Sequence, residues 1–247
     1  MNWSGPAIIL SARVHGESAA IAQVLSREAG RYAGLVHGRR TKTALLQPGN
    51  LIEAYWRARL EEHLGVMTLE LVSARTADAL SDRTALAALN SACAIALTAL
   101  PERDPHPQLY QALDLVLSHL GDRALWPALY VRWEVGLLAE LGFALELDKC
   151  AMTGASADLA YVSPNTGKAA SRSAGAPYAE RLLSLPKFLS GGDLGNGPSW
   201  HDIGEGLALT GHFLEKRLYA AHNATLPVAR ARLVEEVARL AHAERDG

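Results

Sequence analysis

The ten residues Leu51-Ile52-Glu53-Ala54-Tyr55-Trp56-Arg57-Ala58-Arg59-Leu60 carry the clearest structural pattern in the chain. Apolar residues alternate with a second row, and the apolar row consists of Ile52, Ala54, Trp56, Ala58 and Leu60. An alternation of period two is typical of a β-strand with one face in a core, since successive side chains point to opposite faces. The pattern therefore predicts a strand whose outward face carries Tyr55, Arg57 and Arg59.

Four further short apolar stretches lie in the first 76 residues. Strands are expected at residues 7–14, 30–37 and 66–74, and the first should place Ile8, Leu10, Ala12 and Val14 on one face. Residues 19–26 fit either a strand or a helical turn, because alanine favours helix. Five short strands in about 75 residues predict a small antiparallel barrel or sandwich.

The pattern becomes helical after Thr76. Helices are expected at residues 77–100, 108–120, 126–141, 207–222 and 228–245, with a further, interrupted candidate at 178–189. Glycine and proline punctuate residues 150–177, which predicts a loop-rich insert. The expected fold class is therefore α+β: a barrel domain over residues 1–76, then an α-helical domain over residues 77–247 that contains the insert.

Composition excludes several classes of protein. The chain has 247 residues, of which 49% are hydrophobic and 20% charged, which is typical of a globular protein. No apolar run approaches the roughly 18 residues that span a bilayer, so no membrane association is expected. The first six residues lack the basic start of a secretion signal. Cys93 and Cys150 are too few for a disulfide framework, and the simplest expectation is a cytosolic protein.

Catalytic motifs are missing from the sequence. It contains no GxxxxGK[ST], HExxH or GxSxG motif, and the glycine-rich residues 191–197 follow no expected strand, which favours a plain loop. No acid, base and nucleophile come together, so we expect no catalytic residue, no cofactor and no enzymatic activity. An unrecognised enzyme that uses residues 150–200 remains an alternative.

Charge is unevenly distributed along the chain. Residues 1–60 contain eight Lys and Arg against three acids, a net charge of +5, whereas the remaining residues contain 16 bases and 23 acids, a net charge of −7. A basic segment joined to an acidic one is typical of a polyanion-binding module, although ordinary surface charge produces the same imbalance. The loop Gly38–Thr43 contains three of these cations, Arg39, Arg40 and Lys42, and we call it the basic loop.

The basic loop and the outward row of residues 51–60 together suggest a binding groove. Guanidinium groups pair with phosphate, and aromatic rings such as that of Tyr55 stack on unpaired bases. The sequence therefore predicts a nucleic-acid-binding surface on the expected barrel.

Two groups of motifs carry a resemblance to a known family. The first is Ala7-Ile8-Ile9-Leu10 with Arg13, then Gly16-Glu17, Gly30-Arg31 and Gly38-Arg39-Arg40. The second is the segment from Tyr130 to Phe143, which leads to Leu147 and Cys150. In order and spacing, over most of its length, the chain resembles the RecO family of bacterial DNA-repair proteins.

The resemblance implies an N-terminal OB-fold, a C-terminal α-helical domain and a recombination mediator instead of an enzyme. Such proteins bind single- and double-stranded DNA, anneal complementary strands, cooperate with RecR and help RecA displace the single-strand binding protein. A cytoplasmic, nucleoid-associated location is implied. The candidate DNA-binding residues are Arg13, Arg39, Arg40, Lys42, Tyr55, Arg57 and Arg59. A protein-interaction scaffold without direct DNA binding is the alternative.

The insert departs from the family's zinc-bearing members, which have two CxxC pairs there. Cys150 is followed by Thr153 at the position of its partner, and Ser171 and Ala174 stand near the second pair. A lone thiolate cannot close a structural zinc site, so no metal is expected.

The resemblance also implies that the helical domain receives the acidic, apolar C-terminal tail of the single-strand binding protein. Arg123 and Arg132 are candidates for the terminal carboxylate, because arginine forks onto carboxylates. Leu129, Trp133 and Leu137 recur at helical spacing beside Arg132, and a plain core role for this helix is the alternative.

Overall fold

A computed structural model describes residues 1–60, 63–191 and 197–246. The chain divides into two compact units, Met1–Gly121 with Pro227–Leu233, and Asp122–Leu226 with Val234–Gly247. The two units are described separately.

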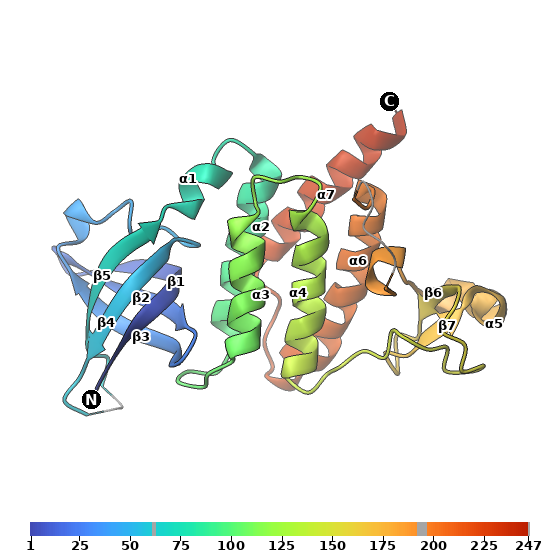
Figure 1. Cartoon of the computed structure of the whole chain (residues 1–247), viewed down its shortest axis with the longest axis horizontal. Coiled ribbons are helices and arrows are strands. Elements are labelled where there is room, and N and C mark those ends of the chain that lie inside the picture. Colours follow the sequence, from blue (N-terminus) through green and yellow to red (C-terminus); the bar gives the residue numbers. More distant parts are fainter. Residues whose placement is uncertain (61–62, 192–196, 247) are drawn as a thin grey trace. The chain divides into compact units, whose positions relative to one another are not determined.

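Five strands form a closed barrel in the first unit (Figure 1). They are β1 (Asn2–His15), β2 (Ala19–Ser26), β3 (Gly30–His37), β4 (Leu51–Arg57) and β5 (Val66–Ser73). The spatial order is β1-β2-β3-β5-β4, and all pairs are antiparallel except β3 with β5. The long β1 closes the barrel because its first half pairs with β4 and its second half with β2. This five-stranded barrel confirms the expected OB-fold.

The strand predicted at residues 51–60 is confirmed for Leu51–Arg57, but it ends there, and Leu60, expected on the inward face, is 43% exposed. The pattern predicted for β1 is wrong in one respect. The register of β1 with β2 shifts between Ile9 and Ser11, so the inward and outward positions of β1 are exchanged after this bulge. Ala7 and Ile9 lie in the barrel core, and Ile8 and Leu10 are buried outside it. Val14, expected on the same face as Ile8, is 64% exposed near one end of the barrel.

Trp56 is the central side chain of the barrel core. Its ring packs edge-on against Tyr32 at a centroid distance of 5.0 Å, and Tyr32 packs in the same manner against Trp3 at 5.3 Å. The Trp56 Nε1–H donates to the carbonyl oxygens of Ala33 and Leu64, at 3.1 and 3.0 Å. These bonds fasten the loop between β4 and β5 against β3.

Three helices follow the barrel within the first unit: α1 (Arg75–Ala79), α2 (Arg83–Ala99) and α3 (Pro107–Ser118). The single helix expected at residues 77–100 is therefore interrupted. The break follows from Asp82, whose carboxylate accepts hydrogen bonds from the backbone N–H groups of Thr84 and Ala85 and so caps a new helix.

The helix α2 packs against β1. Its Cys93 Sγ lies 3.7 Å from the Ile9 carbonyl oxygen, and the Thr76 N–H donates to Asn50 Oδ1 at 3.2 Å. Arg31 Nε donates to the Leu100 carbonyl at 3.0 Å. This packing explains why the outward side of β1 is apolar near Ile8.

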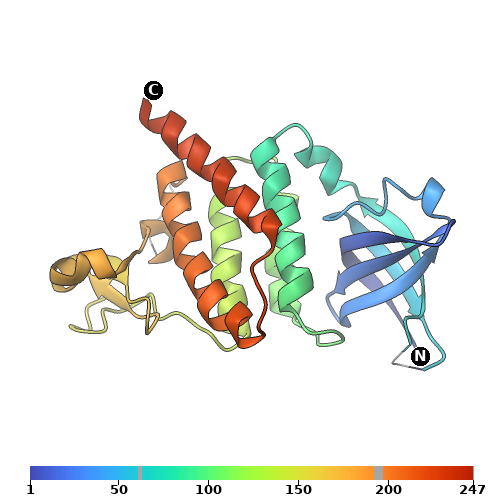
Figure 2. The ribbon, with the colours of Figure 1, turned by 180° about the vertical axis from the view of Figure 1, so that it is seen from behind.

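The second unit contains α4 (Trp126–Glu140) and α6 (Trp200–Phe213), which pack side by side (Figure 2). A π-helical segment, Leu214–Tyr219, extends α6. The helix α7 (Val228–Asp246) begins in the first unit and continues into the second.

The insert, expected to be rich in loops, also contains a small sheet. Its strands are β6 (Leu159–Val162), β7 (Ala169–Ser171) and β8 (Leu183–Ser184), in the order β7-β6-β8, next to the short helix α5 (Arg172–Gly175). The helix expected at residues 178–189 is instead β8 between two 3₁₀ turns, Ala176–Arg181 and Lys187–Leu189. Strands of two to four residues are too short to show an alternation in sequence.

Candidate nucleic-acid interface

A row of paired residues runs around the outside of the barrel. Across the strands, Arg13 pairs with Ile21, Ile21 with Leu35, Leu35 with Val66, and Val66 with Arg57. Ile21, Leu35, Val66 and Arg57 point outward, because their sequence neighbours Ala20, Val36, Met67 and Trp56 are in the core. Arg13 lies on the same face because it pairs directly with Ile21. We call these five residues the outer row.

The outer row has an apolar centre and a cation at each end. Ile21 is buried, Leu35 and Val66 are half-buried, and both arginines are exposed. Neighbouring strands lie about 4.8 Å apart, so the four steps from Arg13 to Arg57 cover about 19 Å along the surface. A surface of this length is sufficient to contact several nucleotides.

The loop between β4 and β5 extends the outer row at Arg57. Arg57, Arg59 and His63 border a pocket of about 510 Å³ that also includes Leu35 and Val66. The Leu35 N–H donates to the Gly65 carbonyl at 3.0 Å, which joins this loop to β3. The structure therefore brings Arg57 and Arg59 together at one pocket, but Arg59 lies beyond the end of β4 and not on the strand where the alternation predicted it.

The basic loop extends the outer row at its other end. The Arg39 N–H donates to the Ser18 carbonyl at 2.9 Å, which places the loop beside the turn between β1 and β2. Arg13 and Arg39 border the same small pocket, of about 140 Å³. The Arg39 Nε is buried and has no hydrogen-bond partner among the described residues. Arg40 is exposed and Lys42 half-buried in the same loop.

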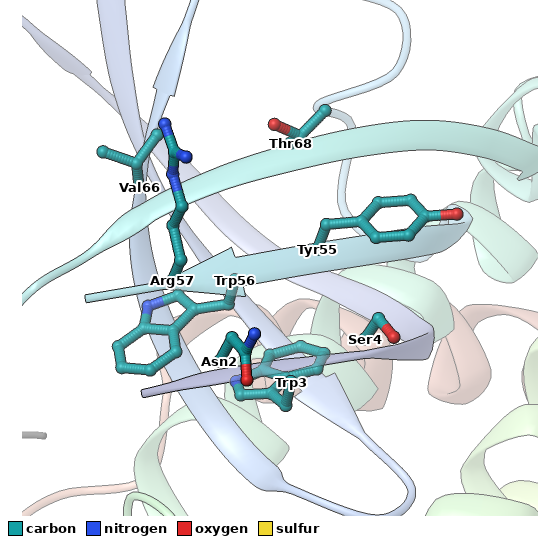
Figure 3. Close-up of a pocket in the computed structure, with 8 residues that line it drawn as sticks. All are labelled: Asn2, Trp3, Ser4, Tyr55, Trp56, Arg57, Val66 and Thr68. Carbon is teal, nitrogen blue, oxygen red and sulfur yellow. The ribbon is translucent and has the colours of Figure 1, made fainter. Parts of the chain in front are cut away.

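A larger pocket opens on the outside of β1, β4 and β5 (Figure 3). Its volume is about 670 Å³, and it is lined by Asn2, Trp3, Ser4, Tyr55, Trp56, Arg57, Val66 and Thr68. We call it the polar pocket. Tyr55, 45% exposed, and Arg57 both border it, so the structure brings these two predicted residues together.

Sequence reasoning did not identify the apolar centre of the outer row or the polar side chains of β1 and β5. These residues become neighbours only through strand register, which no short-range pattern encodes. The predicted outward positions of Tyr55 and Arg57 were the available signals.

The two arginines proposed for the helical domain have partners in their own unit. Arg132 Nε and Nη2 both donate to the Phe188 carbonyl, at 3.1 and 2.6 Å. The guanidinium of Arg123 lies 5.8 Å from the centre of the Trp200 ring. Trp133 and Leu137 are buried, as the alternative core role requires. A peptide site at these arginines stays a prediction.

Both thiols are buried, but their pKa values shift in opposite directions. Burial raises the pKa of Cys93 to about 12. Hydrogen bonds from the Thr153 side chain and from the backbone and side chain of Ser171 lower the pKa of Cys150 to about 6. Across the described residues, no three His, Cys, Asp or Glu side chains are grouped so that they could hold a metal ion. Within the same residues, no helix is long and apolar enough to cross a membrane.

The fold and this surface define an α+β protein built on an OB-fold barrel. Residues 1–75 match the family described as Recombination protein O N terminal, and residues 80–226 match Recombination protein O C terminal. The chain therefore belongs to the RecO family, a family of recombination mediators that act in DNA repair and not a known enzyme class.

Relatives support this assignment over nearly the whole chain. The DNA repair protein RecO of Rhodospirillum centenum is 50% identical over 246 residues, which cover 98% of this chain and 96% of the relative. The DNA repair protein RecO of Rhodospirillum rubrum is 46% identical, with 99% and 100% covered. That of Caulobacter vibrioides is also 46% identical, with 96% and 98% covered.

Proposed function

We propose that the barrel binds single-stranded DNA across the outer row, and that the protein acts as a recombination mediator through this surface. The observation that carries the proposal is the arrangement of Ile21, Leu35 and Val66 between two exposed arginines. Bases pack against Leu35 and Val66, the two half-buried members of the apolar centre, and the guanidinium groups pair with phosphates at both ends.

The basic loop and the loop between β4 and β5 lengthen the phosphate path. In OB-folds, nucleic acid binds the face formed by the second and third strands and the loops that border it. Arg39 borders the same pocket as Arg13, so the basic loop adds a cation at that end of the outer row. Double-stranded DNA contacts the same cations through its backbone alone.

The remaining functions follow from membership of the family. We propose that the protein anneals complementary strands, cooperates with RecR and assists the loading of RecA onto DNA covered by the single-strand binding protein. The C-terminal tail of that binding protein is proposed to dock on the helical domain, near Arg123 and Arg132. The proposed location is the cytoplasm, in association with the nucleoid.

Fluorescence anisotropy with a labelled dT20 oligonucleotide tests the proposal. The double substitution Arg13→Ala/Arg57→Ala removes both ends of the outer row. Each lost phosphate contact on a single strand reduces the slope of log affinity against log salt by about 0.7, so we expect a loss of about 1.4.

The matched control is Arg172→Ala/Arg181→Ala, which removes two exposed arginines from the second unit and should leave the slope unchanged. An unaltered slope and affinity in the Arg13→Ala/Arg57→Ala protein would refute the site. Failure of the wild-type protein to bind DNA at any salt concentration would favour the scaffold alternative.

A further inference from the structure

We propose that two copies of the chain pair through the outward face of β1, β4 and β5, about a two-fold axis at Tyr55. The inference goes beyond the proposed function, because it assigns a second copy of the chain to this face. Its basis is the order of charges along β4, where a cation and a carboxylate lie on opposite sides of a tyrosine.

Strand register arranges the outward side chains of this face in three consecutive rungs. The first rung contains Asn2, Arg57 and Val66, the second Ser4, Tyr55 and Thr68, and the third Pro6, Glu53 and Glu70. Each rung lies two residues, or about 7 Å, from the next along the strands. The face is therefore positively charged at the first rung, neutral at the second and negatively charged at the third.

The charges of the first and third rungs are not balanced within the described part of the chain. Glu53 and Glu70 pair directly across β4 and β5, and like charges in opposite positions destabilise a sheet. Neither carboxylate forms a salt bridge with a described residue, and the same holds for Arg57. Glu70 and Arg57 are exposed and Glu53 is half-buried, so a partner can reach all three.

A two-fold axis through the second rung brings these opposite charges together. The axis lies between two packed faces, at right angles to β4, and reverses the strand direction in the second copy. Arg57 of each copy then lies opposite Glu53 of the other, and Glu70 is one strand, about 4.8 Å, to the side. Such an isologous contact is self-complementary, since each copy contributes both charges.

The neutral second rung fits the centre of this contact. Tyr55, which is 45% exposed, meets its counterpart at the axis, and Ser4 and Thr68 lie beside it on β1 and β5 (Figure 3). The polar pocket, of about 670 Å³, offers the tyrosine ring of the second copy a recess lined by hydrogen-bonding side chains. Tyrosine is enriched at protein interfaces because it combines aromatic area with a hydroxyl group.

The small size of the face limits the strength of the contact. Three strands and three rungs span about 10 Å by 14 Å of backbone, which is much less than the roughly 800 Å² that each partner contributes to a stable complex. We therefore expect a reversible dimer with a dissociation constant of at least about 10 μM. Salt should weaken it, because exposed charges contribute much of the attraction.

Arg57 cannot serve the second copy and DNA at the same time, because it is also one end of the outer row. The dimer should therefore dissociate when DNA occupies the outer row. This competition rests on the proposed function, whereas the dimer itself does not.

Sedimentation velocity of the full-length protein tests the inference through charge reversal. Arg57→Glu places a carboxylate opposite Glu53, and Glu53→Lys/Glu70→Lys places lysines opposite Arg57. Each variant alone should weaken the dimer at least tenfold. An equimolar mixture restores opposite charges at both contacts, so a dimer with one copy of each variant should form, within about threefold of the wild-type affinity.

A matched control and a measurement independent of charge accompany this test. Arg181→Glu reverses an exposed arginine of the second unit and should dimerise as wild type. In Tyr55→Cys the two new thiols meet at the axis, so diamide should oxidise them to a disulfide between the copies. Tyr178→Cys, at a tyrosine that is 55% exposed in the second unit, should remain monomeric on a non-reducing gel. Cys93 and Cys150 are buried in both proteins.

Several results would overturn the inference. A wild-type protein that stays monomeric well above about 10 μM would eliminate the dimer and leave the proposed function intact. A dimer that persists in both charge variants, a mixture that fails to restore pairing, or a dimer that Tyr55→Cys does not cross-link would place the contact elsewhere.

The competition has its own measurement. Saturating dT20 should convert wild-type dimers into DNA-bound monomers. A dimer that stays intact with bound dT20 would overturn the competition at Arg57. A protein that dimerises but binds no dT20 would contradict the proposed function and support the dimer alone.

Discussion

Arg39, Arg40 and Lys42 occupy three different environments within one short loop. Arg39 is half-buried beside Arg13, Arg40 is exposed, and Lys42 is half-buried at the end of the 3₁₀ helix Arg39–Thr41. The loop also caps the barrel, because Leu46 a few residues later is part of the barrel core. The cations thus lie on a loop that is anchored to the barrel core at Leu46.

Replacing all three cations with alanine should weaken DNA binding without unfolding the barrel, because Leu46 and the strands are retained. The slope of log affinity against log salt should decrease by about 2–3, at roughly 0.7 to 0.9 per lost phosphate contact. Anisotropy titrations at several salt concentrations measure the slope. Arg172→Ala/Arg181→Ala/Lys187→Ala is the control, and an unchanged slope in the loop variant would exclude the loop from the interface.

Cys150 should make the stability of the protein depend on pH. Its pKa is about 6 in the folded chain, against an ordinary value of 9.0, so between these values the unfolded chain binds more protons. The stabilisation is complete above pH 9, decreases as pH falls, and is lost below pH 6. Urea titrations should show that Cys150→Ser loses more stability, relative to wild type, at pH 8.5 than at pH 6.5.

The other thiol, Cys93, should affect the stability of the protein over a different pH range. Its pKa, raised to about 12, affects stability only above pH 9, where the folded chain binds the extra proton. An identical pH dependence in wild type and Cys150→Ser would contradict the assignment of the low pKa to Cys150.

At the scale of elements, the sequence was informative where one face of a strand is polar. The strand β4 alternates clearly because Tyr55 and Arg57 are exposed while Trp56 is buried. In β1 the bulge after Ile9 and the cover from α2 obscure the alternation. The short strands of the insert and the register that builds the outer row depend on contacts far apart in sequence, which local patterns do not encode.

The insert should fold without zinc. A structural zinc site needs about four ligands, and Cys150 is the one cysteine between residues 150 and 200, a segment without histidine before His201. Elemental analysis of untagged protein should find no stoichiometric zinc, and EDTA should leave the thermal unfolding transition unchanged. One zinc per chain, or unfolding on chelation, would show that the sheet of β6, β7 and β8 depends on a metal.

At the scale of the whole molecule, the barrel is not an isolated body within its compact unit. Buried Ile8, Leu10 and Leu25 lie outside the barrel core, and α2 packs against β1. Burial of each such side chain stabilises by about 1.5–3 kcal/mol. Arg75 adds a 2.7 Å ion pair with Asp114 of α3. The barrel therefore depends on the helices that follow it.

A fragment that ends at Thr76 should be much less stable than one that ends at Gly121. The shorter fragment exposes the apolar outward side of β1, so we expect it to bind a hydrophobic dye and to unfold over a broad range of urea concentration. The longer fragment retains α2 and α3 and should unfold cooperatively. Equal cooperativity of the two would mean that residues 1–76 form an autonomous domain.

The closure of the barrel has a consequence for crowding. Because β1 pairs with both β2 and β4, and β3 meets β5 at Leu35 and Val66, every described barrel strand has a neighbour on both sides, and none offers a wholly free edge on which another chain could extend the sheet. Many copies can therefore gather along one DNA molecule without polymerising through their backbones. The barrel should resist amyloid-like aggregation even at high local concentration, and its associations should depend on side chains, which can be tuned one substitution at a time.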